Sequence, residues 1–243
     1  MVEFHRATRA GLIASVALGM SLGLGACAEM SQILQSETGA GGSSNQSVFG
    51  RAVKESLELS STRAAELLSK TGGYQNNSLY RIRLPEPVQP IAARLRQFGL
   101  GGQVDQIEKL MNQGAEHAAV EAKAVFIDAV RSMTITDAMG IVRGSDTAAT
   151  DYFRQHTEAQ LRVKYLPIIQ NNLRQIGFYS QYQQLLSSYK QLPLANKPDL
   201  DLEQHVLTQS LKALFTQVGE EEKAIRKDPI GRGSSAIAAV FGR

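Results

Sequence analysis

The sequence predicts an all-α protein, a single multi-helix domain of roughly eight helices over residues 48–243 behind a signal peptide and a flexible tether. Three observations predict this fold. After residue 48 no stretch sustains the apolar–polar alternation of strands, helix start and stop signals recur instead, and no linker divides the region. The hydrophobic content of 43% is sufficient for a real core.

The N-terminus has the pattern of a lipoprotein signal peptide over residues 1–26. Arg6 and Arg9 precede a charge-free run over 11–24, which is too short to span a bilayer comfortably. The run ends in Leu-Gly-Ala before Cys27, and this resembles a bacterial lipobox, in which the cysteine carries lipid. The alternatives are an ordinary signal peptide with a chance cysteine, or an uncleaved anchor helix.

Residues 27–47 predict a lipidated Cys27 followed by a tether rich in Gly, Ser, Gln and Asn. Ala28 follows the cysteine, and in enterobacterial lipoproteins a residue other than Asp there resembles the default for transfer to the outer membrane. We therefore expect a lipid-anchored protein of the cell envelope that faces the periplasm. Because Cys27 is the only cysteine, the body must fold without an intramolecular disulfide.

The first half of the body predicts helices separated by glycines. Ser47 can cap a helix over 48–70, which a Gly-Gly pair stops, and a short helix follows that ends at Gly99. Between them, residues 80–85 alternate briefly and predict either one extended strand or an irregular arm. An apolar stripe then predicts one long helix over 103–133 whose small central residues allow close helix packing.

In the second half, pairs of capping residues predict where the helices begin. Thr134 with Asp137 caps a short helix that ends near Gly144, and Ser145 or Asp146 caps the next. Thr157 with Gln160 predicts another start, with a possible kink at Pro167 before a stop at Gly177. The remaining helices are expected over 178–192, 202–227 and 235–241, the second of them beginning with Asp201 and Gln204 and ending at Asp228–Pro229.

Composition and motifs argue against several function classes. Without residues 1–26 the chain holds 24 Lys and Arg against 22 Asp and Glu, and it has no Trp, a balance that does not favour nucleic-acid binding. The sequence lacks GxSxG, HExxH, GxxxxGK[ST] and GxGxxG motifs, so no cofactor is expected. His117 and Glu121 are four residues apart and could share a metal, although a solvated helix face explains them better. Neither His156 nor His205 predicts more than a surface residue.

The most distinctive segment runs from Gly144 to Phe153, where a polar turn leads directly into a helix. Unpaired N–H groups at such a start can hold an anion, while Asp146 and Thr147 can also simply cap the helix. The candidate binding residues are Asp146, Thr147, Thr150, Tyr152, Glu222 and Arg226. Glu222 and Arg226 are four residues apart, which favours a surface ion pair.

These residues also carry a resemblance to a bacterial family, domain of unknown function 4197. The similarity covers roughly residues 50–242, and Asp-Thr-Ala-Ala-Thr at 146–150 is its most specific part; other matching pieces include Met111-Asn112, Glu221-Glu222 and Val240-Phe241-Gly242. The resemblance implies an all-helical envelope protein, often a lipoprotein, without an established activity. Family members tend to have prolines where Val120 and Ala124 stand and an Arg where Gln113 stands, so we expect no break in the long helix here.

Together these features favour a non-enzymatic module that binds an envelope partner or maintains the envelope. The alternative is a periplasmic enzyme or small-ligand protein with a pocket around Asp146, Thr147, Thr150 and Tyr152. A concave, partly buried convergence of these side chains would favour the alternative, whereas local capping would favour the binding module.

Overall fold

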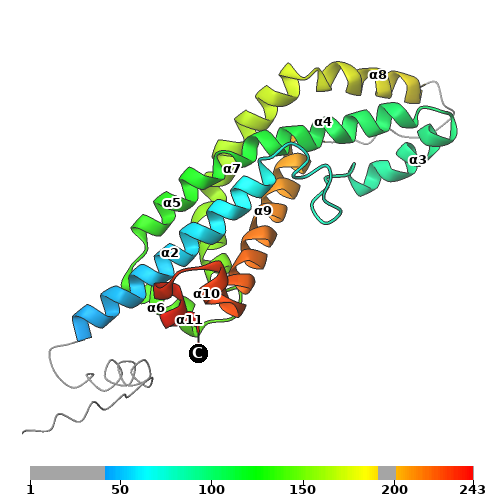
Figure 1. Cartoon of the computed structure of the whole chain (residues 1–243). Helices are drawn as coiled ribbons and strands as arrows, with labels where there is room; N and C mark the ends of the chain where they lie inside the picture. The colour runs from blue at the N-terminus through cyan, green and yellow to red at the C-terminus, as the bar shows by residue number, and fades with distance from the viewer. Residues whose placement is uncertain (1–41, 191–200, 243) are drawn as a thin grey trace, which may run out of the picture. The chain divides into compact units, whose positions relative to one another are not determined.

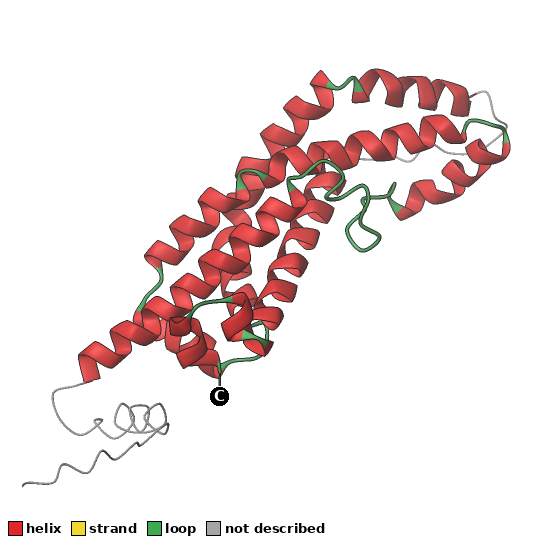
Figure 2. Cartoon of the chain, in the orientation of Figure 1, coloured by secondary structure: helices red, strands yellow, loops and turns green. Residues whose placement is uncertain are grey.

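The protein, described by a computed structural model over residues 42–190 and 201–242, is built of helices and contains no strand within those ranges (Figure 2). The predicted all-α fold is confirmed. Cys27, with the predicted signal peptide and the tether up to residue 41, lies outside the described residues. Helix α2 (Gly42–Leu68) begins six residues before the predicted start at residue 48.

Helix α2 leads into an irregular segment. It lies antiparallel to helix α5 (Ala122–Ser132), since Lys54 Nζ donates to Arg131 O at 3.4 Å and the Lys123 ammonium pairs with Glu66 at 3.4 Å. After α2 the chain makes turns and then runs extended, and we call residues 74–85 the arm. Of the two predicted possibilities for residues 80–85, the irregular arm is the one observed.

A short hairpin of helices follows the arm. The 3₁₀ helix η1 (Glu86–Val88) leads into α3 (Gln89–Gln97), and α4 (Gly101–Ala119) returns alongside α3. Gly99 ends α3 as predicted, with a φ of 77° that L side chains rarely adopt, while Leu100 N donates to Leu95 O at 2.8 Å.

The predicted long helix over 103–133 is wrong in one respect, because it is broken between α4 and α5. At the break Glu121 N donates to Ala118 O at 3.1 Å, an i to i−3 bond that tightens the last turn of α4. Val120 stays exposed there, while Ala119 and Ala122 on either side are fully buried. The break forms without a proline at this position.

The predicted helix start at Thr157 is also wrong. Helix α7 (Ala148–Gln175) passes through it without interruption, because the Thr157 hydroxyl donates back to Phe153 O at 2.6 Å instead of capping a new helix. Before it, α6 (Ile135–Arg143) begins with the predicted capping pair: Thr134 accepts from Asp137 N and the Asp137 carboxylate accepts from Thr134 N. Pro167 lies inside α7 on its exposed side.

Helix α7 is the centre of the domain. Its buried side chains recur every four residues from Phe153 to Leu173, and four residues advance a helix by about 400°, so the buried face turns by about 40° at each step. Over that length the buried face therefore turns roughly halfway around α7. This explains how α7 can pack on α4, α5 and α9 together.

The C-terminal helices complete the domain. Helix α8 (Phe178–Lys190) packs along α4, and α9 (Leu202–Lys227) along α7. Asp201 caps α9 as predicted, with its side chain accepting from Gln204 N at 3.0 Å. After Asp228, the short helices α10 (Pro229–Arg232) and α11 (Ser235–Phe241) pack on each other.

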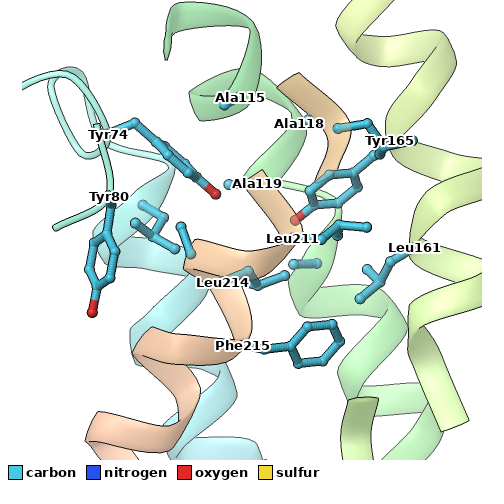
Figure 3. Packing of buried hydrophobic residues seen from close by; sticks show 14 of the residues in the cluster. Tyr74, Tyr80, Ala115, Ala118, Ala119, Leu161, Tyr165, Leu211, Leu214 and Phe215 are labelled. Atoms are coloured by element: carbon cyan, nitrogen blue, oxygen red, sulfur yellow. The ribbon is translucent and has the colours of Figure 1, made fainter. Parts of the chain in front are cut away.

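The bundle encloses one hydrophobic core. Figure 1 shows α2, α5, α7 and α9 side by side, with α6, α10 and α11 gathered at one end and the α3–α4 turn at the other. At the centre, the ring of Tyr165 lies among Ala118, Ala119 and Leu211 (Figure 3), so the small residues of α4 make room for a large ring from α7. No described helix is long and apolar enough to cross a membrane.

Candidate functional site

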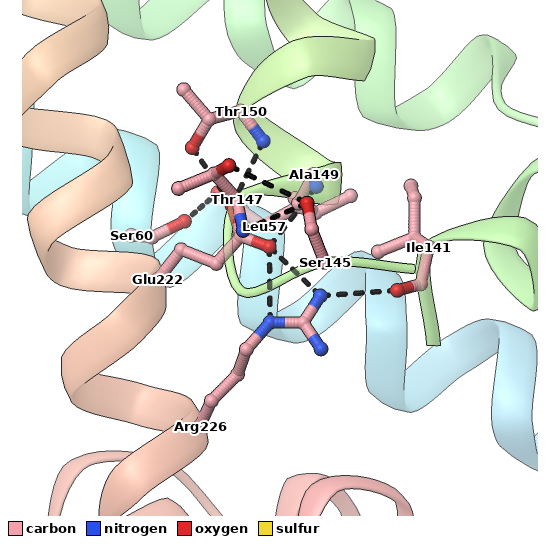
Figure 4. A network of polar contacts seen from close by, with 9 residues as sticks. All are labelled: Leu57, Ser60, Ile141, Ser145, Thr147, Ala149, Thr150, Glu222 and Arg226. Atoms are coloured by element: carbon pink, nitrogen blue, oxygen red, sulfur yellow. Dashed lines mark hydrogen bonds and ion pairs between the residues drawn. The ribbon is translucent and has the colours of Figure 1, made fainter. Parts of the chain in front are cut away.

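The Glu222 carboxylate of α9 lies at the N-terminus of α7 (Figure 4). One oxygen, Oε1, accepts from Ala149 N at 3.0 Å, and the other, Oε2, accepts from Thr150 N at 2.9 Å and from the Thr150 hydroxyl at 2.8 Å. The first N–H groups of a helix have no partner inside it, and a negative charge is favoured there. The anion that the sequence predicts at this helix start is therefore supplied by the protein itself.

Arg226 completes this cluster from the next turn of α9. Its Nε and Nη2 donate to Glu222 Oε1 at 3.1 and 2.8 Å, and Nη2 also donates to Ile141 O at 3.0 Å. The guanidinium lies over the ring of Phe241, 4.8 Å from its centre. The Glu222 and Arg226 side chains are only 4% and 14% exposed, so the predicted surface ion pair is in fact buried.

The bonding capacity of Glu222 is fully used. Its two oxygens accept from five donors, whereas an ionised carboxylate offers about four lone-pair positions. Glu222 therefore has no free position for a ligand or for a proton taken from a substrate. The cluster ties together three parts of the chain that are far apart in sequence: the start of α7, the end of α9 and the C-terminal Phe241.

A glycine permits this approach of α7 and α9. Gly219 lies one turn before Glu222, and a Cβ at that position would stand 3.5 Å from the Thr150 hydroxyl and 3.8 Å from Thr147. Both contacts are ordinary van der Waals distances, but any longer side chain would push the helix start away from Glu222.

The other predicted site residues do not join the cluster. Asp146 is exposed in the turn before α7, and the Thr147 hydroxyl lies 3.5 Å from the Ser145 hydroxyl. Tyr152 stacks on His156 with ring centres 4.0 Å apart. Burial and the nearby Asp137 carboxylate raise the pKa of the Tyr152 hydroxyl above its usual value. Of the six predicted binding residues, Thr150, Glu222 and Arg226 meet, while Asp146, Thr147 and Tyr152 lie outside.

The family model for proteins of unknown function designated DUF4197 matches residues 43–242. The chain belongs to this DUF4197 family. No curated protein and no solved structure matches the chain. Residues that carry the resemblance in the sequence, Thr150, Glu222, Arg226 and Phe241 among them, meet in the Glu222 cluster.

A second polar group, which the sequence reading missed, lies on α4 of this DUF4197 domain. Glu108, Asn112 and Glu116 are spaced by four residues and are at most 4% exposed, so they form a buried column beside the apolar stripe. Asn112 accepts from Ile82 N and donates to Ile82 O, both at 2.8 Å. Glu108 accepts from Leu84 N at 3.3 Å.

The rest of the arm is held by Glu116, the third residue of the column, and by helix α9. Glu116 accepts from Tyr74 N at 3.2 Å, while the Tyr74 hydroxyl donates to Ser210 O at 3.0 Å. Tyr80 donates to the Gln217 side chain at 2.8 Å. The arm is therefore fixed to α4 by its backbone and to α9 by its tyrosines.

A groove lies between this arm and α9. Its volume is about 570 Å³, and its lining includes Leu79, Arg81 and Arg83 of the arm and Glu86 of η1. Helix α9 contributes His205, Gln209, Lys212 and Thr216 from one face. The Nε2 atom of His205 lies 2.8 Å from Arg83 O, which closes one side of the groove. None of the predicted binding residues lines it.

The signal for this groove is present in the sequence but weak. A Glu-x₃-Asn-x₃-Glu spacing on an otherwise apolar helix predicts a polar column, and a column beside a core needs partners. The arm that supplies them is 24 to 42 residues away and has no regular secondary structure. Periodicity alone could not connect the two.

The metal hypothesis at His117 and Glu121 finds no support in the geometry. The His117 ring contacts the Asn172 side chain of α7, and Glu121 follows the end of α4, so the two residues are not on one continuous helix. Among the described residues no group of three or more His, Cys, Asp or Glu side chains could hold a metal ion.

Proposed function

We propose that the chain is a lipid-anchored, non-enzymatic binding module of the cell envelope that contacts an envelope partner protein through the groove between the arm and α9. The anchor is Cys27, and its lipobox-like context supports export and attachment facing the periplasm. With Ala28 after the cysteine, the outer membrane is the favoured destination.

One observation carries the choice of a binding module. The polar residues that would build a catalytic or small-ligand pocket at the start of α7 are used internally, since Glu222 is filled by α7 and Arg226. The alternative, a periplasmic enzyme or ligand protein with a pocket around Asp146, Thr147, Thr150 and Tyr152, is disfavoured, because those side chains do not converge on one pocket. Asp146 is exposed in the turn before α7, Thr147 pairs with Ser145, Thr150 bonds Glu222 and Tyr152 stacks on His156. The groove, in contrast, is concave and lined by cationic and amide side chains.

The anchor is tested by the mass of the mature N-terminal peptide. We expect an N-terminal cysteine carrying acyl chains, and a Cys27→Ala variant that leaves the membrane fraction. An unmodified Cys27 thiol would refute the anchor.

The binding surface is tested by a photo-reactive residue in the full chain within the envelope. We expect an identified partner to cross-link from position 209 in the groove, and not from Val163, which is exposed on α7 and lies outside it. An Asp146→Ala variant should cross-link equally well. Equal cross-linking from both positions, or loss of the partner in Asp146→Ala, would refute the groove as the binding surface.

A further inference from the structure

The length of the groove along α9 indicates the shape of a ligand that would fit it. The α9 residues that line it run from His205 to Thr216, which at 1.5 Å per residue is about 16 Å along the helix. An extended peptide advances about 3.3 Å per residue, so about five residues fit along this face. The volume of about 570 Å³ is also in the range of small binding clefts.

The charges of the groove are unbalanced toward the positive. Arg81, Arg83 and Lys212 line it against one acidic residue, Glu86. Within the part of the chain that the structure describes, the Arg83 and Lys212 side chains are exposed and have no hydrogen bond or ion pair. A concave surface with unpaired cations carries a focused positive potential, which attracts ligands that bear carboxylates or phosphates.

Arg81 adds a buried donor to the same wall. Its Nη2 pairs with Glu108 at 3.2 Å, but its Nε is buried without a hydrogen-bond partner among the described residues. A buried N–H without an acceptor costs about 1–3 kcal/mol in general.

The remaining lining favours a peptide over a single-stranded nucleic acid. Single-stranded nucleic acids are held largely by stacking of their bases on open aromatic faces. Two ring side chains line the groove, and each is held by the protein: Tyr80 is 6% exposed with its hydroxyl bound to Gln217, and the Nε2 atom of His205 lies 2.8 Å from Arg83 O. Leu79, which is 83% exposed at the start of the lining segment, offers an apolar contact instead.

We propose that the groove binds an extended acidic segment of the partner protein, with its carboxylates on Arg83 and Lys212 and an apolar residue against Leu79. This inference rests on the proposed function, because it names the ligand chemistry of the same surface. The groove need not rearrange to receive this segment, because the arm that forms its wall is already held by Asn112 and Glu108 of α4.

The test uses a fluorescent hexapeptide, one leucine followed by alternating Asp and Glu, titrated with the full chain and followed by fluorescence anisotropy. We expect binding that weakens between about 50 and 300 mM salt, because exposed charges are screened over that range. The Arg83→Glu/Lys212→Glu double variant should lose at least about tenfold in affinity. A peptide with Asn and Gln in place of the acids should lose a similar factor.

The matched control is the Lys109→Glu/Arg143→Glu double variant, which makes the same change in net charge at exposed residues outside the groove. It should bind the peptide within about twofold of the parent protein. Equal losses in both double variants would show a general charge effect and overturn the proposal. So would equal binding of the neutral peptide, or full competition by inorganic phosphate or a short oligonucleotide at the same concentration.

The outcomes separate this inference from the proposed function. If position 209 cross-links a partner but the acidic peptide does not bind, the ligand class is refuted and the binding module stands. If position 209 cross-links only to residues of the same chain, the groove is filled internally and both are overturned.

Discussion

Replacing Glu222 with alanine should be among the most costly single changes in the domain. The substitution removes the acceptor of three donors at the start of α7: the backbone N–H groups of Ala149 and Thr150 and the Thr150 hydroxyl. It also leaves the Arg226 guanidinium, 14% exposed, with only Ile141 O and the Phe241 ring as partners.

The expected cost is about 3–5 kcal/mol, the range for removing one member of a buried ion pair. Each buried amide left without an acceptor costs about 1–3 kcal/mol, and these terms overlap rather than add. Domains are stable by only about 5–15 kcal/mol, so the loss is a large fraction of the total. Arg226→Met should cost less, about 1–2 kcal/mol, because Glu222 would keep its three donors from α7.

The assay is equilibrium unfolding of the full chain in urea at pH 7, followed by the helical circular dichroism signal. The control is Glu220→Ala, which removes an exposed partner of Lys223 from the same helix and should cost less than about 0.5 kcal/mol. The capping argument requires that Glu222→Ala costs clearly more than Arg226→Met. Equal costs would mean that the ion pair alone matters, and the reasoning would be refuted.

Three further changes test other parts of the structure. Asn112→Ala removes the side chain that satisfies the arm backbone, so the arm amides should exchange with deuterium at least about tenfold faster while α7 is unaffected; unchanged exchange would contradict the column. Thr134→Ala should cost about 1 kcal/mol at pH 7. The Thr134 hydroxyl lowers the pKa of the Asp137 carboxyl below its ordinary 3.8, so this contribution is present above pH 3.8 and is lost as the pH falls through the lower folded value. The difference in unfolding free energy between the parent and Thr134→Ala should therefore shrink from pH 7 to about pH 3, and a difference that widened would count against it. Gly99→Ala should lower stability by about 1 kcal/mol in thermal unfolding, because its φ of 77° strains any residue with a side chain. Gly102→Ala, in α4 with open space around the added Cβ, should be neutral or stabilising. Equal effects of the two substitutions would be inconsistent with the backbone argument.

Local signals in the sequence predicted the helical fold and several helix ends well. The Thr134–Asp137 and Asp201–Gln204 pairs begin their helices as expected, and Gly99 ends α3. Each of these signals acts within about one helical turn, so a few neighbouring residues suffice to recognise it.

Signals that depend on tertiary contacts were missed or misassigned. The start of α7 was expected to be capped by Ser145 or Asp146, but its cap is Glu222, 72 residues from Thr150. The Thr157 capping box was overruled by packing, since Thr157 is fully buried and bonds backward within α7. The break at Val120 also has no local breaker residue, since neither a proline nor a glycine stands between Ala118 and Ala122.

Three of the six predicted binding residues meet in the structure, and the other three lie outside the cluster. The sequence indicated that Thr150, Glu222 and Arg226 matter, and they do meet. Their polar groups bond to one another inside the protein. The groove lies elsewhere, along an arm that no periodic pattern in the sequence marks.

The attachment of the arm to α4 has a consequence for the rate at which the groove can be occupied. A loop that must become ordered upon binding slows association and reduces affinity, because each immobilised residue loses conformational entropy. Here the backbone of Ile82 is held on both its N–H and its C=O by one side chain, and Tyr74 and Tyr80 fasten the same segment to α9. That entropy is lost once, when the domain folds. A ligand that arrives at the groove meets a surface already shaped to receive it, so encounter rather than rearrangement should limit its binding.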